Sequence, residues 1–168
     1  KNLSTFSELG VYSVAMSVAG IATILSSIFN TIWAPMIYKW VKDGEDLDKI
    51  DLISEHLLAA IYFLIVFVGL FSWVIPCFLP EEYNKIQYLI NLCLFAPLFY
   101  TLSETTAIGI AIARKTSLSM LASITAMLVN ALGNYLLVPK IGSQGAAIST
   151  AISFGIFYIL RTEFSRKV

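Results

Sequence analysis

The sequence predicts an all-α fold, a polytopic integral membrane bundle with about five transmembrane helices. Apolar residues make up 58% of the 168 residues and charged residues only 13%, whereas a soluble domain is about a quarter charged. The apolar residues also gather in runs of the ~20 residues that a helix needs to cross ~30 Å of hydrocarbon. Composition and run length together indicate that lipid surrounds the fold.

The same composition argues against several classes of function. The formal net charge is zero and most basic residues lie in short connections, so we expect no nucleic-acid partner. Cys77 and Cys93 show neither a CxxC nor a Cys/His spacing, so we expect no metal or redox site and no cofactor. Because no nucleophile elbow, phosphate loop or carboxylate pair within one span is found, we expect that the protein is not an enzyme.

The first two predicted spans flank the most strongly charged stretch of the chain. The first span covers 9–34 and ends before Pro35, which lacks the amide donor of a continuing helix. Residues 39–56 place apolar side chains at helical spacing opposite acids and lysines. That pattern predicts a cytoplasmic amphipathic loop, a short helix lying on the membrane surface. The second span covers 57–79.

Three further spans follow, separated by short connections. The third covers 86–113 and ends at Arg114, and the fourth covers 117–138 and stops at Pro139. The glycines of the IGSQG segment then suit a tight turn. The fifth span covers 145–160 and is followed by a polar tail, RTEFSRKV.

Charge sets the expected orientation of this single membrane domain, 1–168. Alternating sides puts one group of basic residues opposite Lys1, Lys85 and Lys140; its members are Lys39, Lys42, Lys49, Arg114, Lys115, Arg161, Arg166 and Lys167. By the positive-inside rule the larger group, with the C-terminus, is cytoplasmic. The chain opens at Lys1 without a methionine or a signal peptide, so we interpret it as a fragment.

Small and polar residues form a stripe along one face of the first span. Its members, at steps of three and four, are Ser13, Ser17, Gly20, Thr23, Ser27, Asn30 and Ala34. Lipid would solvate these groups poorly, so the stripe faces either neighbouring helices or a water-filled cavity. We take Ser17, Thr23, Ser27 and Asn30 as candidates for a cavity wall, with helix packing as the alternative.

Two further features lie within the spans. Asn130 and Asn134 stand one helical turn apart in the fourth span, where they either join helices by hydrogen bonds or contact a hydrophilic substrate. Glu104 is an acid within the third span, where an ionised carboxylate is costly unless it faces a cavity, pairs with a cation or stays protonated. It is therefore a candidate for ion coupling, with a purely structural acid as the alternative.

Two segments carry a resemblance to a known family. They are ELGVYSVAMSVAGIATILSSIFNTIWAPMIYKW near the start and LVPKIGSQGAAISTAIS near the end. The chain resembles the O-antigen flippases, polysaccharide exporters whose superfamily also holds multidrug antiporters. The shared motifs are Gly10 to Ser13 and Pro139 to Ala147, which serve packing and turns. They therefore identify a family better than they locate a site.

The resemblance implies a transporter with about twelve spans in two bundles, of which this chain would form most of the second. Such proteins move a glycan on polyprenyl diphosphate, here an undecaprenyl-diphosphate-linked repeat unit, across the bacterial inner membrane. The expected partners are that lipid-linked oligosaccharide, membrane lipids and the missing N-terminal helical bundle. No Lys or Arg lies inside a predicted span, so we expect the diphosphate to be met by other helices.

Other functions remain open at this point. A cation-coupled multidrug antiporter of the same superfamily would share the helical layout and could use Glu104. A membrane-embedded sugar polymerase or ligase would need a large extracytoplasmic loop, and the predicted connections are short. A membrane scaffold without transport would keep the polar stripe packed and inaccessible to hydrophilic probes.

Overall fold

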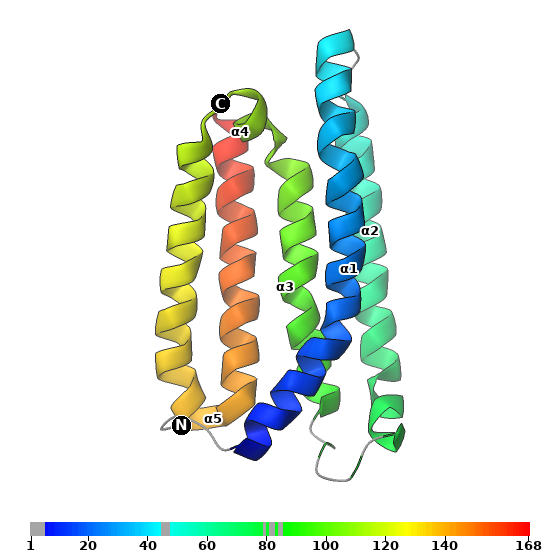
Figure 1. Ribbon diagram of the computed structural model, residues 1–168, viewed down its shortest axis with the longest axis vertical. Coiled ribbons are helices and arrows are strands. Elements are labelled where there is room, and N and C mark those ends of the chain that lie inside the picture. The colour runs from blue at the N-terminus through cyan, green and yellow to red at the C-terminus, as the bar shows by residue number, and fades with distance from the viewer. Residues whose placement is uncertain (1–5, 45–47, 79, 81–82, 84–85) are drawn as a thin grey trace.

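The computed structural model describes residues 6–44, 48–78, 80, 83 and 86–168. Within these residues the fold is a bundle of long helices without strands (Figure 1). Helices α1, α3 and α5, together with the segment Lys49–Ile75 in α2 and η1, are long and apolar enough to cross a membrane. The predicted all-α membrane bundle is therefore confirmed, and the chain is a multi-pass membrane protein.

Helix α1 (Phe6–Asp43) is longer than the first predicted span because it continues through Pro35. A proline removes one backbone donor, but membrane helices tolerate that loss where neighbouring groups satisfy the freed carbonyl. Packing also favours continuation, because Trp33 and Ile37 are buried on either side of the proline and cluster with Ile50 of the next helix. The expected helix end at Pro35 was wrong for this reason.

The charged stretch 39–56 was predicted to form a separate surface helix, but the structure shows that it does not. Its first part completes α1, and α2 (Asp48–Phe71) begins within it; residues 45–47 lie outside the described residues. The two helices form a hairpin whose tip projects beyond the other helices (Figure 1). Ile50 and Ile53 of this stretch pack against Trp33 and Ile37 of α1, whereas Leu52 is exposed. A short 3-10 helix, η1 (Ser72–Phe78), continues α2.

Helix α3 (Ile86–Thr106) lies at the centre of the bundle. Eleven of its residues are buried, and its neighbours include α1, α2 and α5. The predicted third span, 86–113, is interrupted at Ala107, after which the short α4 (Ile108–Ile112) begins. The connection 80–85, which was predicted to be tight, lies largely outside the described residues.

Helix α5 (Thr116–Arg166) consists of two antiparallel arms joined at a sharp break (Figure 1). The break occurs at Ile141 and Gly142, and Gly142 has a φ of 58°, which glycine adopts without steric cost. The arms pack closely beyond the turn, where a Cβ added at Gly145 would lie 2.6 Å from the carbonyl carbon of Leu137. The two arms together with α1, α2 and α3 make five apolar passes.

The second arm of α5 continues past the predicted end of the fifth span at 160. Residues 161–166 were predicted to be a polar tail, yet they remain helical up to Arg166. Their Thr and Ser side chains find partners on α3 and α4, since Thr162 bonds Thr106 and Ser165 bonds the Gly109 amide. Arg161 therefore lies inside a helix of the bundle.

The segments that carry most basic residues meet at one end of the bundle. The hairpin tip, α4 with the turn after it, and the end of α5 all lie at the top of Figure 1. Lys140 lies at the opposite end, at the junction of the two arms of α5; Lys1 and Lys85 lie outside the described residues. The cytoplasmic placement of the basic end stays a prediction.

The contact at Gly145 generates a stability prediction. In the complete gene product, Gly145→Ala is expected to destabilise the fold by roughly 1–3 kcal/mol, because the added methyl group meets backbone atoms that cannot move aside. Thermal unfolding of the purified protein in detergent measures this. The control is Gly20→Ala, which meets nothing within 4 Å and is expected to leave the melting temperature unchanged or slightly raised. Equal melting temperatures for the two variants would contradict the close packing of the arms.

Candidate functional site

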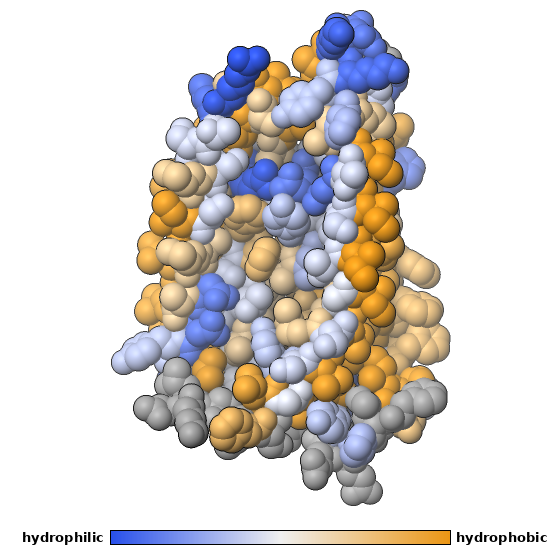
Figure 2. Space-filling view, in the orientation of Figure 1, coloured by the Kyte–Doolittle hydropathy of each residue, from blue (hydrophilic) through white to orange (hydrophobic). Residues whose placement is uncertain are grey.

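A cleft of about 870 Å³ opens along one face of the bundle. One wall is α1 and the opposite wall is the first arm of α5, while α3 and the second arm of α5 lie between them (Figure 1). Figure 2 shows this face, with pale and blue residues between orange flanks. The polar residues that line the cleft are Thr23, Ser26, Ser27, Asn30, Ser123, Asn130, Thr150 and Ser153.

The structure brings together most of the predicted site residues. Thr23, Ser27 and Asn30 line the cleft from α1, and Asn130 lines it from α5. Ser17 lies on α1 outside the cleft lining, exposed, with its hydroxyl donating to the Ser13 carbonyl at 2.9 Å. Two polar features that are far apart in the sequence therefore face one space.

Asn130 connects the two arms of α5. Its amide nitrogen lies 3.2 Å from both the Thr150 and the Ser153 hydroxyl oxygens, and its backbone carbonyl accepts from Ser149 at 2.9 Å. Asn134 does not line the cleft but donates to the Asn130 side-chain oxygen at 2.9 Å. Asn130 thus joins the two arms and also borders the cleft, and Asn134 donates a hydrogen bond to it.

Some hydroxyl groups on this side of α1 pack against α3, and others border the cleft. Ser26, which was outside the predicted stripe, is buried against α3 and contacts the Pro97 carbonyl at 3.3 Å and the Thr101 hydroxyl. Ser27 is exposed, and its hydroxyl donates to the Ile24 carbonyl of its own helix at 2.8 Å. A hydroxyl that donates to its own backbone still has lone pairs with which to accept a hydrogen bond. The Ser27 hydroxyl therefore offers an acceptor on the cleft side of α1.

Aromatic rings line the cleft at the end nearer α4. The rings of Tyr100 in α3 and Phe157 in α5 are nearly parallel and stacked, with centroids 6.3 Å apart and an interplanar angle of 4°. Phe154 lies beside Phe157 at 6.2 Å in an edge-to-face arrangement. All three rings border the cleft, so this end combines flat apolar faces with the polar groups described above.

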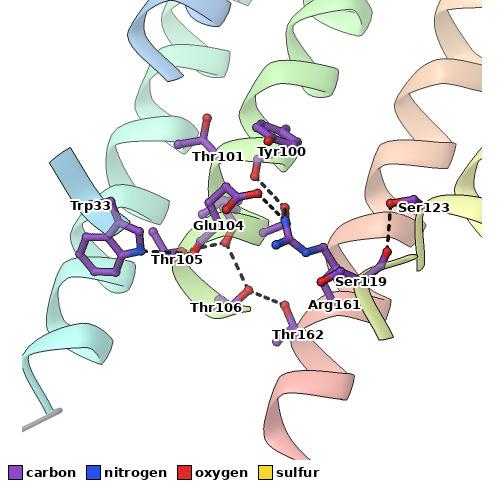
Figure 3. Close-up of polar contacts among 12 residues, drawn as sticks. Trp33, Tyr100, Thr101, Glu104, Thr105, Thr106, Ser119, Ser123, Arg161 and Thr162 are labelled. Carbon is purple, nitrogen blue, oxygen red and sulfur yellow. Dashed lines mark hydrogen bonds and ion pairs between the residues drawn. The ribbon is translucent and has the colours of Figure 1, made fainter. Parts of the chain in front are cut away.

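Glu104 forms an ion pair with Arg161, one helical turn beyond these rings (Figure 3). The Arg161 Nη1 atom lies 2.5 Å from Glu104 Oε1 and 2.9 Å from the Ser103 hydroxyl. The exposed fractions of the two side chains are 28% for Glu104 and 12% for Arg161. Trp33 of α1 donates to the backbone carbonyl of Glu104 at 3.2 Å. Three helices thus converge on this pair.

Arg161 is the partner of Glu104 that sequence reasoning missed. The fifth span was ended at the last apolar residue, which left Arg161 in a supposed tail and placed no basic residue inside the bundle. One signal was available: the tail RTEFSR contains neither Gly nor Pro, so nothing in it stops a helix. Thr162 and Ser165 also share a face at helical spacing.

The described residues contain no cluster of three or more His, Cys, Asp or Glu side chains that could hold a metal ion. The single histidine, His56, is exposed on α2, with Nδ1 2.7 Å from the Leu52 carbonyl oxygen. The chemistry that the cleft can supply is hydrogen bonding and aromatic contact, with one ion pair at its end.

The cleft generates an accessibility prediction. In a background with Cys77 and Cys93 replaced, Thr23→Cys and Ser27→Cys are expected to react with a membrane-impermeant thiol reagent, because both positions border the cleft. The matched control is Ile24→Cys, since Ile24 is 61% exposed but does not line the cleft and would face lipid. Labelling at 24 equal to that at 23 and 27 would contradict a water-filled cleft.

Comparison with known proteins shows a distant similarity to a glycan flippase. Over 164 residues the chain is 20% identical to a protein of Haloferax volcanii that is named a probable low-salt glycan biosynthesis flippase, Agl15. The alignment covers 95% of this chain and 35% of that protein, so the chain spans about a third of the relative's length. No model of a known protein family matches the chain, and no solved structure matches it.

Proposed function

We propose that this protein translocates lipid-linked glycans across a membrane. In the specific form of the proposal, the cargo is an undecaprenyl-diphosphate-linked O-antigen or other polysaccharide repeat unit, and the membrane is the bacterial inner membrane. The observation that carries the proposal is the cleft of about 870 Å³, which combines hydroxyl and amide groups with apolar and aromatic side chains. The similarity to a probable glycan biosynthesis flippase supports it.

The shape and chemistry of the cleft suit the polar head of such a lipid. Sugars must cross ~30 Å of hydrocarbon without losing their hydrogen bonds. The cleft volume lies within the ~300–1,000 Å³ of typical ligand sites. Its opening along one face would let a polyprenyl chain remain in lipid while the glycan enters (Figure 2). We assign sugar contacts to Thr23, Ser27, Asn30 and Asn130; Ser17 extends the stripe and Asn134 orients Asn130.

The proposal includes the rest of a transporter. We infer that the chain, 1–168, forms most of a C-terminal bundle whose cleft faces an N-terminal helical bundle of the same protein. The open cleft and the match to about a third of the relative support this arrangement. Alternating access would come from movement of one bundle against the other. The hairpin tip and the C-terminus would lie in the cytoplasm, and the role would be transport, without catalysis.

A cation-coupled multidrug antiporter is the second candidate. Met16, Met127, Phe154 and Phe157 line the cleft, and such flexible or flat apolar side chains also accept aromatic cations. The hydroxyl and amide groups of both walls favour the glycan, because hydroxyl oxygens that donate within the protein can still accept hydrogen bonds from sugar hydroxyls. The experiment below separates the two functions.

The test is surface display of polysaccharide in a bacterium that lacks its own flippase and makes a matched glycan. The complete wild-type gene is expected to restore display. Asn130→Leu is expected to lower it about tenfold or more, because the cleft loses an amide and the arms lose a hydrogen bond of about 1.4 kcal/mol. Leu128→Ala, on the exposed outer face of the same arm, serves as the control and is expected to restore display.

Membrane levels of every variant are measured by immunoblot. Absence of display with wild-type protein present would overturn the glycan proposal. Resistance to cationic drugs in the same cells would then favour the antiporter.

Ion coupling through Glu104 is a separate part of the proposal. Glu104→Gln removes the charge with little change in volume and is expected to abolish display while the protein still reaches the membrane. Counterflow of substrate in proteoliposomes, which needs no ion gradient, is expected to persist in this variant. Loss of display and counterflow together would assign Glu104 a structural role instead.

A further inference from the structure

The Glu104–Arg161 pair is an incomplete ion pair. Both contacts of the guanidinium to Glu104 and Ser103 use Nη1, whereas Nε is buried and has no hydrogen-bond partner among the described residues. A guanidinium normally satisfies a carboxylate with two parallel N–H groups. The Nε–H group of Arg161 therefore remains available as a hydrogen-bond donor while Glu104 neutralises the charge of the guanidinium.

The pair adjoins the cleft. The Arg161 guanidinium lies 5.2 Å from the centroid of the Phe157 ring, and Phe157 lines the cleft. Tyr100, which also lines the cleft, lies beside both charged groups (Figure 3). Two residues that line this end of the cleft are thus direct neighbours of the ion pair.

We propose that Arg161 is a binding residue for the diphosphate of the lipid-linked substrate, and that Glu104 occupies it until the diphosphate displaces the carboxylate. This inference rests on the proposed function and deepens it. It also replaces the expectation that only other helices contact the diphosphate.

Physical chemistry favours an exchange over a free cation. An unpaired guanidinium within the bundle is costly, so an empty cleft needs a counter-ion at this position. Phosphate oxygens accept from the guanidinium fork at least as well as a carboxylate does, and they could use the Nε donor that Glu104 leaves unpaired. Because one anion replaces another, Arg161 is never left without a partner.

The alternative is a latch that only holds helices together. The neighbouring bonds, Thr106 to Thr162 at 2.6 Å and the Gly109 amide to Ser165 at 2.9 Å, already join α3 and α4 to α5 next to the pair. The two roles predict opposite signs for one variant. If the pair only holds helices together, loss of either charge weakens ligand binding. If the diphosphate replaces the carboxylate, loss of the Glu104 charge strengthens ligand binding because Arg161 is free for the ligand.

The experiment measures binding of a short-chain polyprenyl diphosphate without sugars to the complete protein in detergent, by native mass spectrometry. Arg161→Gln is expected to weaken binding about tenfold or more, as loss of one charge-assisted contact implies. Glu104→Gln is expected to strengthen it several-fold, since the competing anion is gone. The matched control is Arg166→Gln on the same helix, because Arg166 is 74% exposed and forms an ion pair with its neighbour Glu163; it is expected to bind like wild type.

Several results would overturn the inference. The first is unchanged diphosphate binding in Arg161→Gln, and the second is weakened diphosphate binding in Glu104→Gln. The third is an equal loss of phosphatidylglycerol binding in Arg161→Gln, which would indicate a general site for anionic lipids. If Arg161→Gln unfolds, as its melting curve would reveal, Arg161→Lys replaces it; this variant keeps the charge without the fork and is expected to bind with intermediate affinity. If the wild-type protein binds the diphosphate but does not restore polysaccharide display, the glycan cargo is refuted. The assignment of Arg161 as a diphosphate-binding residue is then unaffected.

Discussion

The bundle depends on one constraint: polar groups within a membrane must find their partners inside the protein. Most hydroxyls of α1 donate to carbonyls of their own helix, as Ser13 and Ser17 do. The amide of Asn130 is satisfied by hydroxyls of the returning arm of α5, and the charge of Glu104 by Arg161. The last two solutions each hold two segments in register, and the cleft lies where such groups from different segments remain partly uncovered.

The sequence predicted the fold class because hydropathy depends only on composition and run length, which need no knowledge of packing. It was less successful at helix ends. Pro35 did not end α1, because the buried neighbours Trp33 and Ile37 compensate for one missing backbone donor. The end of α5 was placed too early for a related reason: the polar residues after 160 have partners on α3 and α4, and partners are invisible in a hydropathy profile.

The candidate site was predictable in part. Helical spacing placed Thr23, Ser27 and Asn30 on one face and suggested a cavity wall, and the cleft lies against that face. Spacing could not indicate which residues oppose them, because α1 and Asn130 are about a hundred residues apart in the chain. Nor could it pair Glu104 with Arg161, since that contact requires knowledge that the second arm of α5 returns beside α3.

The break at Gly142 has a consequence for how the cleft is assembled. One wall and part of the floor of the cleft belong to a single helical hairpin, whose arms are adjacent in sequence and can associate as soon as both have entered the bilayer. The other wall, α1, is synthesised first and can pack on α3 before α5 is made. A cleft built in this order has two sides that form separately and meet when the α5 hairpin docks. Its width is therefore set by the angle at which α1 meets α3, through contacts such as Ser26 with Thr101.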